Sequence, residues 1–458
     1  MTVFLLIIVL GRAQPKLELQ RSVPENEAWL SRDFDTALEI LRKKPETVIN
    51  LYNFGMLYEQ KNDLKKAMEY YSLALSDDST YIYSYISLAG LYIKQNQKAS
   101  AKFVLLKGLQ IDKENYELLL LLAKDYLLLN QEYEAEKIFK VLVDKYEREL
   151  EPRTYLSQIY RRQKKYQEAM ELFTIDKTVY PTARFLLEKA KVLQLMGESL
   201  KAKRINDEVC SNYPNSEELG CVNKQPVNYT PNHVFNYKID VNEALDYKVK
   251  YGFITLGWLN VRINRTLDIN GRKAYHVVFY VNSNPAFSFL ISLHHIYESF
   301  IDAETLAPVE SRLLTPNEKI YMLRTYFYDY KRNKFNAYLI AHDGHFHHVE
   351  KPMPKMAHDG TSILYYARGL LSNQMSDTMI VVVDEEYRWA AINYLNKREE
   401  INIKDKDINA IKIFAKVEFE GVAGMNGDAW GWFSPDGNAV PLEGKIKIIL
   451  GSITLTQY

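Results

Sequence analysis

Histidines are concentrated in one short part of this chain, and imidazole is the side chain best suited to bind a transition metal or move a proton near neutral pH. Five of the nine histidines are His342, His345, His347, His348 and His358. The dipeptide Asp343-Gly344 is typical of a two-residue hairpin turn, which places His342 and His345 opposite each other. Strand side chains alternate between faces, so His347 shares the face of His345. The spacing therefore predicts three imidazoles on one face of a hairpin.

Two interpretations of this cluster differ in chemistry. In the first, His342, His345 and His347 bind zinc or copper, with Asp359 or His358 completing the site, and the protein is a metal-dependent hydrolase. In the second, the cluster is a solvated, His-rich hairpin tip, or a surface that responds to pH. We favour the second, because no carboxylate is spaced to orient the rings of a metal site.

Other reactive patterns are absent from the sequence. It contains no Gly-rich phosphate loop ending in Lys and Ser or Thr, no His-Glu-x-x-His and no Gly-x-Ser-x-Gly. The carboxylates at Asp384, Glu385 and Glu386 are typical of a charged loop or strand end. We therefore expect a protein that is not an enzyme, and no cofactor.

The chain has two cysteines, Cys210 and Cys221. In an oxidising compartment they can form a disulfide, which would join the last helix of the N-terminal half to the segment after it. Two separate buried thiols are the alternative. The pair alone lacks the ligands that a zinc site needs.

Composition and charge limit the function classes. The 458 residues are 47% hydrophobic and 25% charged, which is ordinary for a folded protein and long enough for two or three domains. Lys+Arg and Asp+Glu are 58 each, so no net field attracts nucleic acid. No segment reaches the length that crosses a membrane. We expect neither nucleic-acid binding nor a membrane span.

The N-terminus resembles an export signal. Val3 to Leu10 is an unbroken apolar run, and the small residues Gly11 and Ala13 follow it. This pattern predicts a signal peptide over residues 1–13, cleaved after Ala13, and an exported protein located in the periplasm or at the outer envelope. No basic residue precedes the run, so the alternatives are a true start further upstream and a buried first helix.

A repeat of 34 residues runs through the first half. It is marked by a small residue and by a tyrosine nine positions before it, at Ala67, Ala101, Ala135 and Ala169 and at Tyr58, Tyr92, Tyr126 and Tyr160. This period is typical of stacked helix-turn-helix units, which bind partners more often than they catalyse. We interpret the tyrosines and phenylalanines at these repeat positions as packing residues of the array.

The repeat pattern resembles the tetratricopeptide repeat family. The match predicts an all-α solenoid over residues 25–215, with about five repeats and a partial unit around Trp29. In this family, the inner, concave face binds a protein partner. The corresponding positions are Tyr52, Met56, Tyr83, Ile86, Leu120, Lys124, Leu127, Gln158 and Arg161.

These inner positions are apolar in the first three units and basic in the last. Contiguous apolar area usually marks a contact, so the groove should hold a peptide or the chain's own second domain. Packing within the array is the alternative. One subgroup of the family grips a C-terminal carboxylate with a Lys/Asn clamp. Tyr52 and Met56 replace two clamp positions here, so we do not expect that ligand.

The second half has a different period. Residues 216–234 are expected to be a linker, and residues 235–458 an antiparallel β-rich domain with one helix at Thr361 to Asn373. The simplest architecture for this domain is a partly open barrel. With the helical first half, the whole chain is expected to have an α + β multidomain fold. The expected strands include Ala244 to Phe253, Trp258 to Arg265, Ala274 to Val281, Ile320 to Tyr328, Ile411 to Phe419 and Lys445 to Leu455.

A second resemblance covers roughly Phe235 to Tyr458. The stretches NEALDYKVKYGFITLGWLNVRI, HHIYESFIDAETLAPVESRLL, GTSILYYARGL and WGWFSPDGNAVPLEGKIKIILGSITLTQ are similar to an exported bacterial family of unknown function, number 3108. The resemblance implies an envelope location and a barrel-like fold, similar in outline to periplasmic carriers of apolar cargo. It implies no reaction.

Three hypotheses follow. The leading one is a cell-envelope scaffold that binds a protein partner through the repeats. The second is a carrier that holds a lipid or other apolar ligand in the C-terminal barrel. The third is the metal-dependent hydrolase. For the carrier, the expected cavity residues are Phe253, Trp258, Phe279, Phe287, Phe289 and Trp432, with an ordinary filled core as the alternative.

Overall fold

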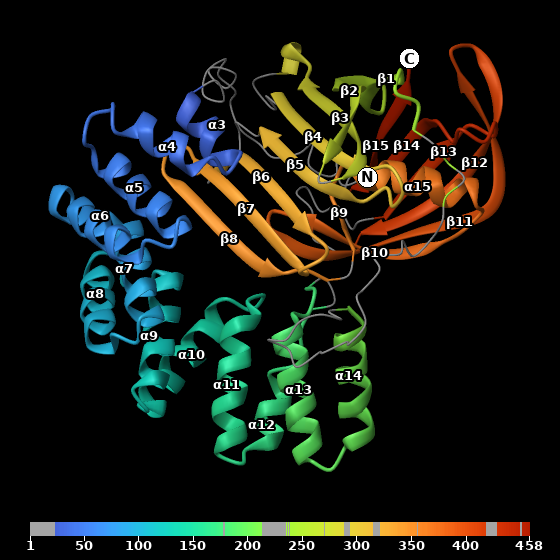
Figure 1. The fold of residues 1–458 in the computed structure, drawn as a ribbon. Coiled ribbons are helices and arrows are strands. Elements are labelled where there is room, and N and C mark those ends of the chain that lie inside the picture. Colours follow the sequence, from blue (N-terminus) through green and yellow to red (C-terminus); the bar gives the residue numbers. More distant parts are fainter. Residues whose placement is uncertain are drawn as a thin grey trace.

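A computed structural model describes residues 23–176, 179–212, 235, 237, 239–269, 271–287, 294–314, 321–354, 356–417, 428–448 and 451–458. Paired helices form an arc, and a curled β-sheet lies beside it (Figure 1). The expected signal peptide and the linker at 216–234 lie outside the described residues. None of the described helices is both long and apolar enough to cross a membrane.

The arc is built from short antiparallel helices. They are α3 (Pro24–Leu30), α4 (Phe34–Leu41), α5 (Val48–Gln60), α6 (Leu64–Asp77), α7 (Ile82–Lys94), α8 (Lys98–Ile111), α9 (Tyr116–Leu128), α10 (Glu132–Lys145), α11 (Leu150–Arg162), α12 (Tyr166–Glu171), α13 (Ala183–Leu195) and α14 (Ser199–Asn212). The expected α-helical repeat array is confirmed.

The turn between the two helices of a unit contains a residue with positive φ at the same repeat position. Asn62, Asn96 and Asn130 have φ of 60, 58 and 57°, and Lys164 has 63°. Asparagine tolerates this left-handed region better than most residues, because its short polar side chain can hydrogen-bond locally. The turns therefore recur at the 34-residue interval of the sequence pattern.

Small residues bring the paired helices together. Ala67, Ala101, Ala135 and Ala169 are each 0% exposed. Gly55 in α5 lies against the ring of Tyr71 in α6, and a Cβ at position 55 would be closer to that ring than van der Waals contact allows. Gly90 in α7 has nothing within 4 Å of such a Cβ.

These two glycines give a matched pair of substitutions. We expect Gly55→Ala to lower the free energy of unfolding by about 1 to 3 kcal/mol, because the ring of Tyr71 must move. We expect Gly90→Ala to raise it by about 0.5 to 1 kcal/mol, because alanine favours a helix over glycine. Urea unfolding measures both, and equal effects would contradict the tight packing at Gly55.

The third unit has a charged residue at a core position. Asp125 in α9 is 0% exposed, and neither carboxylate oxygen accepts a hydrogen bond from any residue that the structure describes. The matching positions of other units are Leu57, Leu91 and Ile159, which are at most 1% exposed. Burial raises the pKa of Asp125 above 3.8, and the charge of Lys102 only partly opposes this. The buried carboxyl of Asp125 therefore lowers the folding stability of the array.

We expect Asp125→Leu to raise the free energy of unfolding at neutral pH by about 1 to 3 kcal/mol, because an unpaired buried carboxylate is removed. The native carboxyl keeps its proton to a higher pH than the unfolded chain. The contribution of Asp125 to wild-type stability therefore falls as pH rises from 3.8 through its native pKa, and then levels off. The advantage of Asp125→Leu should grow over that interval. Urea unfolding at several pH values measures it, and a constant advantage would disprove the assignment.

In the described residues, the second half forms a 15-stranded sheet that is not closed. Its strands are β1 (Ala244–Tyr251), β2 (Ile254–Ile269), β3 (Arg272–Ser283), β4 (His294–Asp302), β5 (Pro308–Leu314), β6 (Tyr321–Asp329), β7 (Lys334–Ala341), β8 (Phe346–Pro352), β9 (Ala357–His358), β10 (Asp377–Val383), β11 (Glu386–Ile403), β12 (Lys406–Val417), β13 (Asp428–Phe433), β14 (Pro441–Ile448) and β15 (Gly451–Gln457). The short 3-10 helix η3 (Pro285–Phe287) follows β3.

The sheet is a long meander folded back on itself. Its order is β8-β7-β6-β5-β4-β3-β2-β1-β15-β14-β13-β12-β11-β10-β9. The pairs are antiparallel, except that β9 is parallel to β10. The first and last strands, β1 and β15, pair at the centre. This confirms the expected partly open, antiparallel β-rich domain. The expected strand from Lys445 to Leu455 is wrong, because that segment is the hairpin of β14 and β15.

One helix, α15 (Ser362–Ser372), lies within the curve of the sheet (Figure 1). It confirms the helix expected at Thr361 to Asn373. Ser362 to Leu371 are all buried, although only one apolar face was expected. The reason is that the sheet curls around the helix, so its side chains join the same apolar core as the strands.

Side chains connect the two ends of the curled sheet. The Arg324 guanidinium on β6 lies 3.0 Å from the carboxylate of Glu385, in the turn between β10 and β11. Lys351 on β8 donates to the Glu385 carbonyl at 3.1 Å, and the hydroxyl of Tyr387 donates to the Pro352 carbonyl at 3.1 Å. These contacts hold the open edges near each other without a strand pair.

Candidate functional site

The hairpin of β7 and β8, residues 334–352, is docked on the first helices of the repeat array. Trp29 of α3 is 0% exposed and stacks on Phe346 of β8, with ring centroids 4.8 Å apart. Its indole N–H donates to the Leu339 carbonyl at 3.1 Å. The apolar core here contains residues of both halves, so helices and sheet fold together at this end.

The side chain of Asn53 joins α5 to the outer edge of β8 as a neighbouring strand would. Its Oδ1 accepts from the Phe346 N–H at 2.7 Å, and its Nδ2 donates to the Gly344 carbonyl at 3.0 Å. Asn53 is 2% exposed, so these polar groups are paired away from water. Further along the same helix, the side-chain Nε2 of Gln60 lies 3.0 Å from the Nδ1 of His348. Asn53 and Gln60 thus cover part of a strand edge that would otherwise be open.

His345 lies on the inner face of the first two repeats. Its ring is 5.9 Å from that of Tyr52 in α5 and 4.0 Å from that of Tyr83 in α7. Its Nδ1 lies 2.6 Å from the Asp343 carboxylate. Burial opposes ionisation of Asp343, but the hydrogen bond and charge of His345 outweigh it and lower the pKa of that carboxyl. The chain's own hairpin therefore occupies the groove at two predicted partner-binding residues.

The turn of this hairpin is longer than the two residues expected. The Ala341 N–H donates to the His345 carbonyl at 3.1 Å, and Gly344 has φ of 94°. Three residues, 342–344, therefore form the loop, and His342 lies within the loop. A loop longer by one residue shifts the pairing, so His342 and His345 are not opposite each other.

The predicted metal ligands are consequently not brought together. Within the part of the chain that the structure describes, which includes His342, His345 and His347, no group of three His, Cys, Asp or Glu side chains is placed to hold a metal ion. Burial lowers the pKa of His347 to about 4, and that of His348 to about 4 as well. Both rings are therefore neutral near pH 7, and the third hypothesis, the hydrolase, has no ligand set here.

The residues expected to complete that site have a structural role instead. Asp359 accepts hydrogen bonds from the N–H groups of Thr361 at 2.9 Å and Ser362 at 2.6 Å, at the start of α15. It also accepts from the hydroxyls of Ser299, at 2.7 Å, and Ser311. His358 is 0% exposed, and burial lowers its pKa to about 3. Asp359 thus accepts hydrogen bonds from backbone N–H groups at the start of the helix and joins it to β4 and β5.

The other predicted inner-face residues are spread along the array. Met56 and Leu120 are buried, and the Tyr71 hydroxyl lies 3.0 Å from the Met56 sulfur. Ile86 and Leu127 are half-buried against apolar clusters. These residues contribute packing as well as surface.

The polar inner positions lie further along, on α9 and α11. Lys124 forms an ion pair with Glu151 at 2.9 Å, and its side chain is 28% exposed. Arg161 is bidentate to Glu188, at 2.5 and 3.3 Å, and Gln158 is half-buried. Each cation therefore has an anionic partner in this groove, so the expected basic character of the last unit is neutralised.

Sequence reasoning missed Trp29, Asn53 and Gln60, which make the contact between the halves. One signal was present. Asn53 is an amide at a position where the next repeats have a hydroxyl, at Ser87, and then the larger Leu121 and Tyr155. An amide in the middle of an otherwise apolar helix face needs a partner, and here that partner is the backbone of β8.

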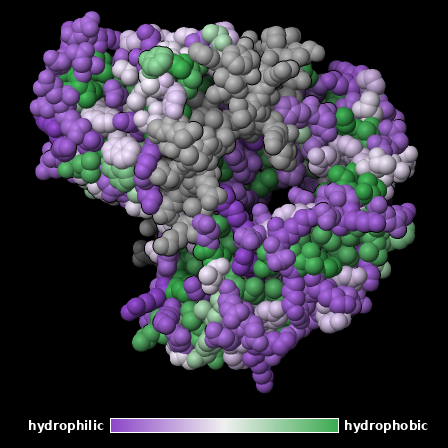
Figure 2. All heavy atoms as spheres, turned by 180° about the vertical axis from the view of Figure 1, so that it is seen from behind, coloured by the Kyte–Doolittle hydropathy of each residue, from purple (hydrophilic) through white to green (hydrophobic). Residues whose placement is uncertain are grey.

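A second contact between the halves occurs near the end of the array. Tyr180, which precedes α13, is 7% exposed and packs with Tyr387 and Trp389 of β11, at ring distances of 6.0 and 5.0 Å. The array therefore touches the sheet at both of its ends. Seen from behind, the molecule is hollowed between helices and sheet (Figure 2).

An apolar pocket lies between α15 and the strands β1 and β11 to β14. Its empty space is about 550 Å³, including solvent at its mouth. The lining residues are Tyr247, Ile363, Leu364, Ala367, Ile392, Ile413, Ala429, Trp430, Gly431, Phe433, Pro441, Glu443, Gly444 and Ile446. Glu443 is the only residue of this lining that carries a charge.

The aromatic residues expected around a cavity do not line this pocket. Phe253 is 95% exposed, Phe279 is buried in the core, and Trp432 packs in a separate small cluster. Trp258 is half-buried on β2. Phe289 and the side chain of Phe287 lie outside the described residues. None of the described residues of that expected lining is at this pocket, and Phe279 has the ordinary core position that was the alternative.

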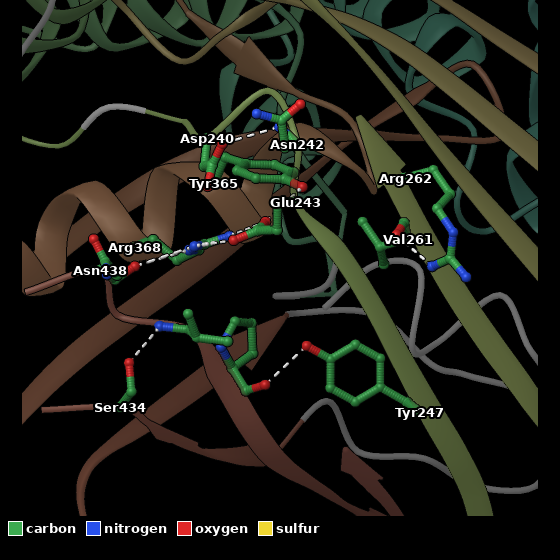
Figure 3. A network of polar contacts seen from close by, with 12 residues as sticks. Asp240, Asn242, Glu243, Tyr247, Val261, Arg262, Tyr365, Arg368, Ser434 and Asn438 are labelled. Carbon is green, nitrogen blue, oxygen red and sulfur yellow. Dashed lines mark hydrogen bonds and ion pairs between the residues drawn. The ribbon is translucent and has the colours of Figure 1, made fainter. Parts of the chain in front are cut away.

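A buried ion pair fastens α15 beside this pocket. Arg368 is bidentate to Glu243, at 2.6 Å for both contacts, and donates to the Asn438 carbonyl at 3.1 Å (Figure 3). The rings of Tyr237 and Tyr365 lie 5.0 and 5.2 Å from the guanidinium. Burial disfavours the charge, but the hydrogen bonds to Glu243 outweigh it and raise the pKa of Arg368. This network joins the helix to the start of β1 and to the loop before β14.

Cys210, near the end of α14, is disulfide-bonded. The residue expected to be its partner, Cys221, lies outside the described residues. The pairing of these two cysteines stays a prediction.

Comparisons with known proteins support both halves of the sequence analysis. The family model described as Protein of unknown function (DUF3108) matches residues 246–457. The tetratricopeptide repeat model matches residues 50–78 and 82–115. No curated protein matches the chain. Both resemblances noted from the sequence are thereby confirmed.

Several solved structures are similar to part of the chain. PilW, a type IV pilus biogenesis factor, is 18% identical, covers 45% of this chain and 98% of its own, and has a TM-score of 0.37. The pilF protein of Pseudomonas aeruginosa is 17% identical. The match covers 43% of this chain and 95% of the pilF chain, with a TM-score of 0.36. A tetratricopeptide repeat protein from Parabacteroides merdae is 19% identical. The match covers 45% of this chain and 83% of the other, with a TM-score of 0.36.

Proposed function

We propose, for a chain that carries tetratricopeptide repeats and a DUF3108 domain, a non-enzymatic scaffold of the cell envelope that binds a protein partner through its later repeats. The observation that carries this proposal is the docked hairpin on the first repeats. His345 contacts Tyr52 and Tyr83, so the chain fills that part of its own groove. A partner is then received by α9 and α11, where Lys124, Leu127 and Gln158 are only partly buried.

Two features support an envelope location. The apolar run from Val3 to Leu10, followed by Gly11 and Ala13, is typical of an export signal. Cys210 is disulfide-bonded, and disulfides persist in oxidising compartments outside the cytosol. The mass of the mature chain from the envelope fraction tests this directly: we expect it to begin at Gln14.

Photo-crosslinking from single positions tests the partner site. A photoreactive residue at Gln158 should form a product with a second polypeptide in the native host. The same residue at Tyr83 should crosslink only within the chain, to the peptide that contains His345. Phe103, which is 60% exposed on α8, is the control on the other helix of a repeat.

The outcomes separate the possibilities. A partner captured from Phe103 but not from Gln158 would place the contact on the outside of the array and overturn the proposed groove. A partner captured at Tyr83 would show that the hairpin leaves the first repeats in the cell.

The apolar pocket beside α15 favours a second candidate, a carrier of a small apolar ligand or part of a lipid chain. Its lining residues are apolar apart from Glu443. Organic extraction of the purified full chain, followed by mass spectrometry, tests this candidate. A stoichiometric lipid that is absent from Ala367→Phe, which fills the pocket, would support it. If neither the wild type nor Ala367→Phe yields a lipid, the carrier candidate is ruled out.

A further inference from the structure

The turn between β1 and β2 exposes a phenylalanine almost completely. Phe253 is 95% exposed, and Tyr251 on the same hairpin is 38% exposed. Gly252, with φ of 57°, supplies the positive φ of the tight turn. The turn conformation itself does not need an aromatic residue beside the glycine. Phe253 therefore adds little to the packing of the fold, and its ring is accessible for a contact outside the chain.

Lysines surround this hairpin on the outer face of the sheet. Thr454 of β15 pairs with Lys250 of β1 on one side and with Lys445 of β14 on the other. Lys447 of β14 pairs with Ser452 of β15, two residues further toward the end of β14. Val249 and Leu455 alternate with these residues and are buried in the core, so the lysines lie on the opposite face.

The charge of this face is positive. Strands β1, β14 and β15 carry Lys248, Lys250, Lys445 and Lys447, against Asp246 and Glu443. Asp246 is already paired with Arg262 of β2, at 2.7 Å. We call Lys250, Tyr251, Phe253, Lys445 and Lys447 the tip patch. Glu443 opposes part of the charge of Lys250 and Lys445, so a net positive charge remains on this face. An exposed aromatic next to an excess of lysines has the composition of a peripheral membrane anchor.

We propose that the tip patch docks on the surface of an anionic lipid bilayer. Phe253 enters the boundary between headgroups and acyl chains, and the lysines bind lipid phosphates. The long lysine side chains suit this arrangement, because their methylene groups can lie along the apolar boundary while the ammonium groups stay in water. The ring of Phe253 and the lysines would then both contact the bilayer.

An acidic protein surface is a less suitable occupant. The patch is a convex hairpin tip rather than a groove, and a single protruding aromatic needs a soft apolar layer or a matching pocket. A bilayer presents that layer everywhere, together with negative charge. One aromatic and a few lysines give weak, reversible binding that salt reduces.

Vesicle co-sedimentation of the full chain tests this proposal. Vesicles of phosphatidylethanolamine and phosphatidylglycerol should bind the protein at low salt, and vesicles of phosphatidylcholine alone should bind it much less. Phe253→Ser should weaken binding by about tenfold, because the inserted ring is lost. Lys250→Gln and Lys447→Gln should each weaken it by about fivefold. Phe253 is nearly fully exposed, so its replacement leaves the fold unchanged, which a melting curve checks.

Phe103→Ser is the matched control, because Phe103 is another exposed phenylalanine, on the repeat helix α8. It should not change vesicle binding. Absence of binding to anionic vesicles at low salt would overturn the proposal. Equal binding by wild type and Phe253→Ser, or a loss with Phe103→Ser alone, would also overturn it. The test is independent of the partner proposed for the repeats, which contact other elements.

Discussion

Replacing Arg368 by methionine is expected to lower the free energy of unfolding by about 3 to 5 kcal/mol. The side chains of Arg368 and Glu243 are 2% and 9% exposed, and their two contacts are 2.6 Å long. Without the guanidinium, the Glu243 carboxylate stays buried and loses its ionic partner. The carbonyl of Asn438 also loses its donor. Urea unfolding followed by circular dichroism of the strands measures the loss.

Two further variants make this result specific. The pair Lys334–Glu350 is 44% and 48% exposed, so Lys334→Met should cost less than about 1 kcal/mol. The double variant Arg368→Met with Glu243→Leu should recover part of the loss, because no charge is left buried. A double variant less stable than Arg368→Met alone would refute this account of the network.

Trp29→Ala is the second substitution with a large expected effect, about 3 to 5 kcal/mol. Trp29 is 0% exposed, stacks on Phe346 and donates to Leu339. Its removal leaves a cavity between the first helices and the docked hairpin. Beyond the loss of stability, the array should separate more readily from the sheet. Limited proteolysis should therefore cut the chain between its halves faster than in the wild type.

The control for this substitution is Phe103→Ala, which removes an aromatic that is 60% exposed. It should change stability by less than about 0.5 kcal/mol. If Trp29→Ala lowers stability but leaves the proteolysis pattern unchanged, the two halves are held together mainly by other contacts, such as Tyr180 with Trp389.

The regular features of both halves were predictable from the sequence. The 34-residue interval of Ala67, Ala101, Ala135 and Ala169 predicted the array, because each unit must place a small residue between its two helices. Alternation in segments such as Ala274 to Val281 predicted strands, because one face of each is buried. Both signals are local and recur, which makes them readable without a structure.

Register at the ends of strands was harder to predict. One extra residue in the turn around Gly344 separates His342 from the position opposite His345, and the predicted metal site depended on that position. The segment from Lys445 to Leu455 was read as one strand. Apolar residues run without interruption from Ile448 to Leu450 in the sequence, and Gly451 is the one turn-type residue before the next alternating stretch.

The contact between the halves could not be predicted, because it joins residues about 290 positions apart. Asn53 and Phe346 each belong to a local pattern that is complete by itself, a helix and a strand. Only the curl of the sheet brings the edge of β8 to α5. The sequence analysis proposed the second domain as one possible occupant of the groove, without identifying the hairpin that occupies it.

The central claim is that the repeats and the sheet form one unit, joined where α5 covers the edge of β8. Amide hydrogen exchange of Phe346 tests this claim most directly, since its N–H donates to Asn53 at 2.7 Å. The account predicts slow exchange in the full chain and much faster exchange in Asn53→Ala, with the amides of β3 unchanged as an internal reference. Fast exchange of Phe346 in the wild type, or the same rate in both proteins, would contradict it.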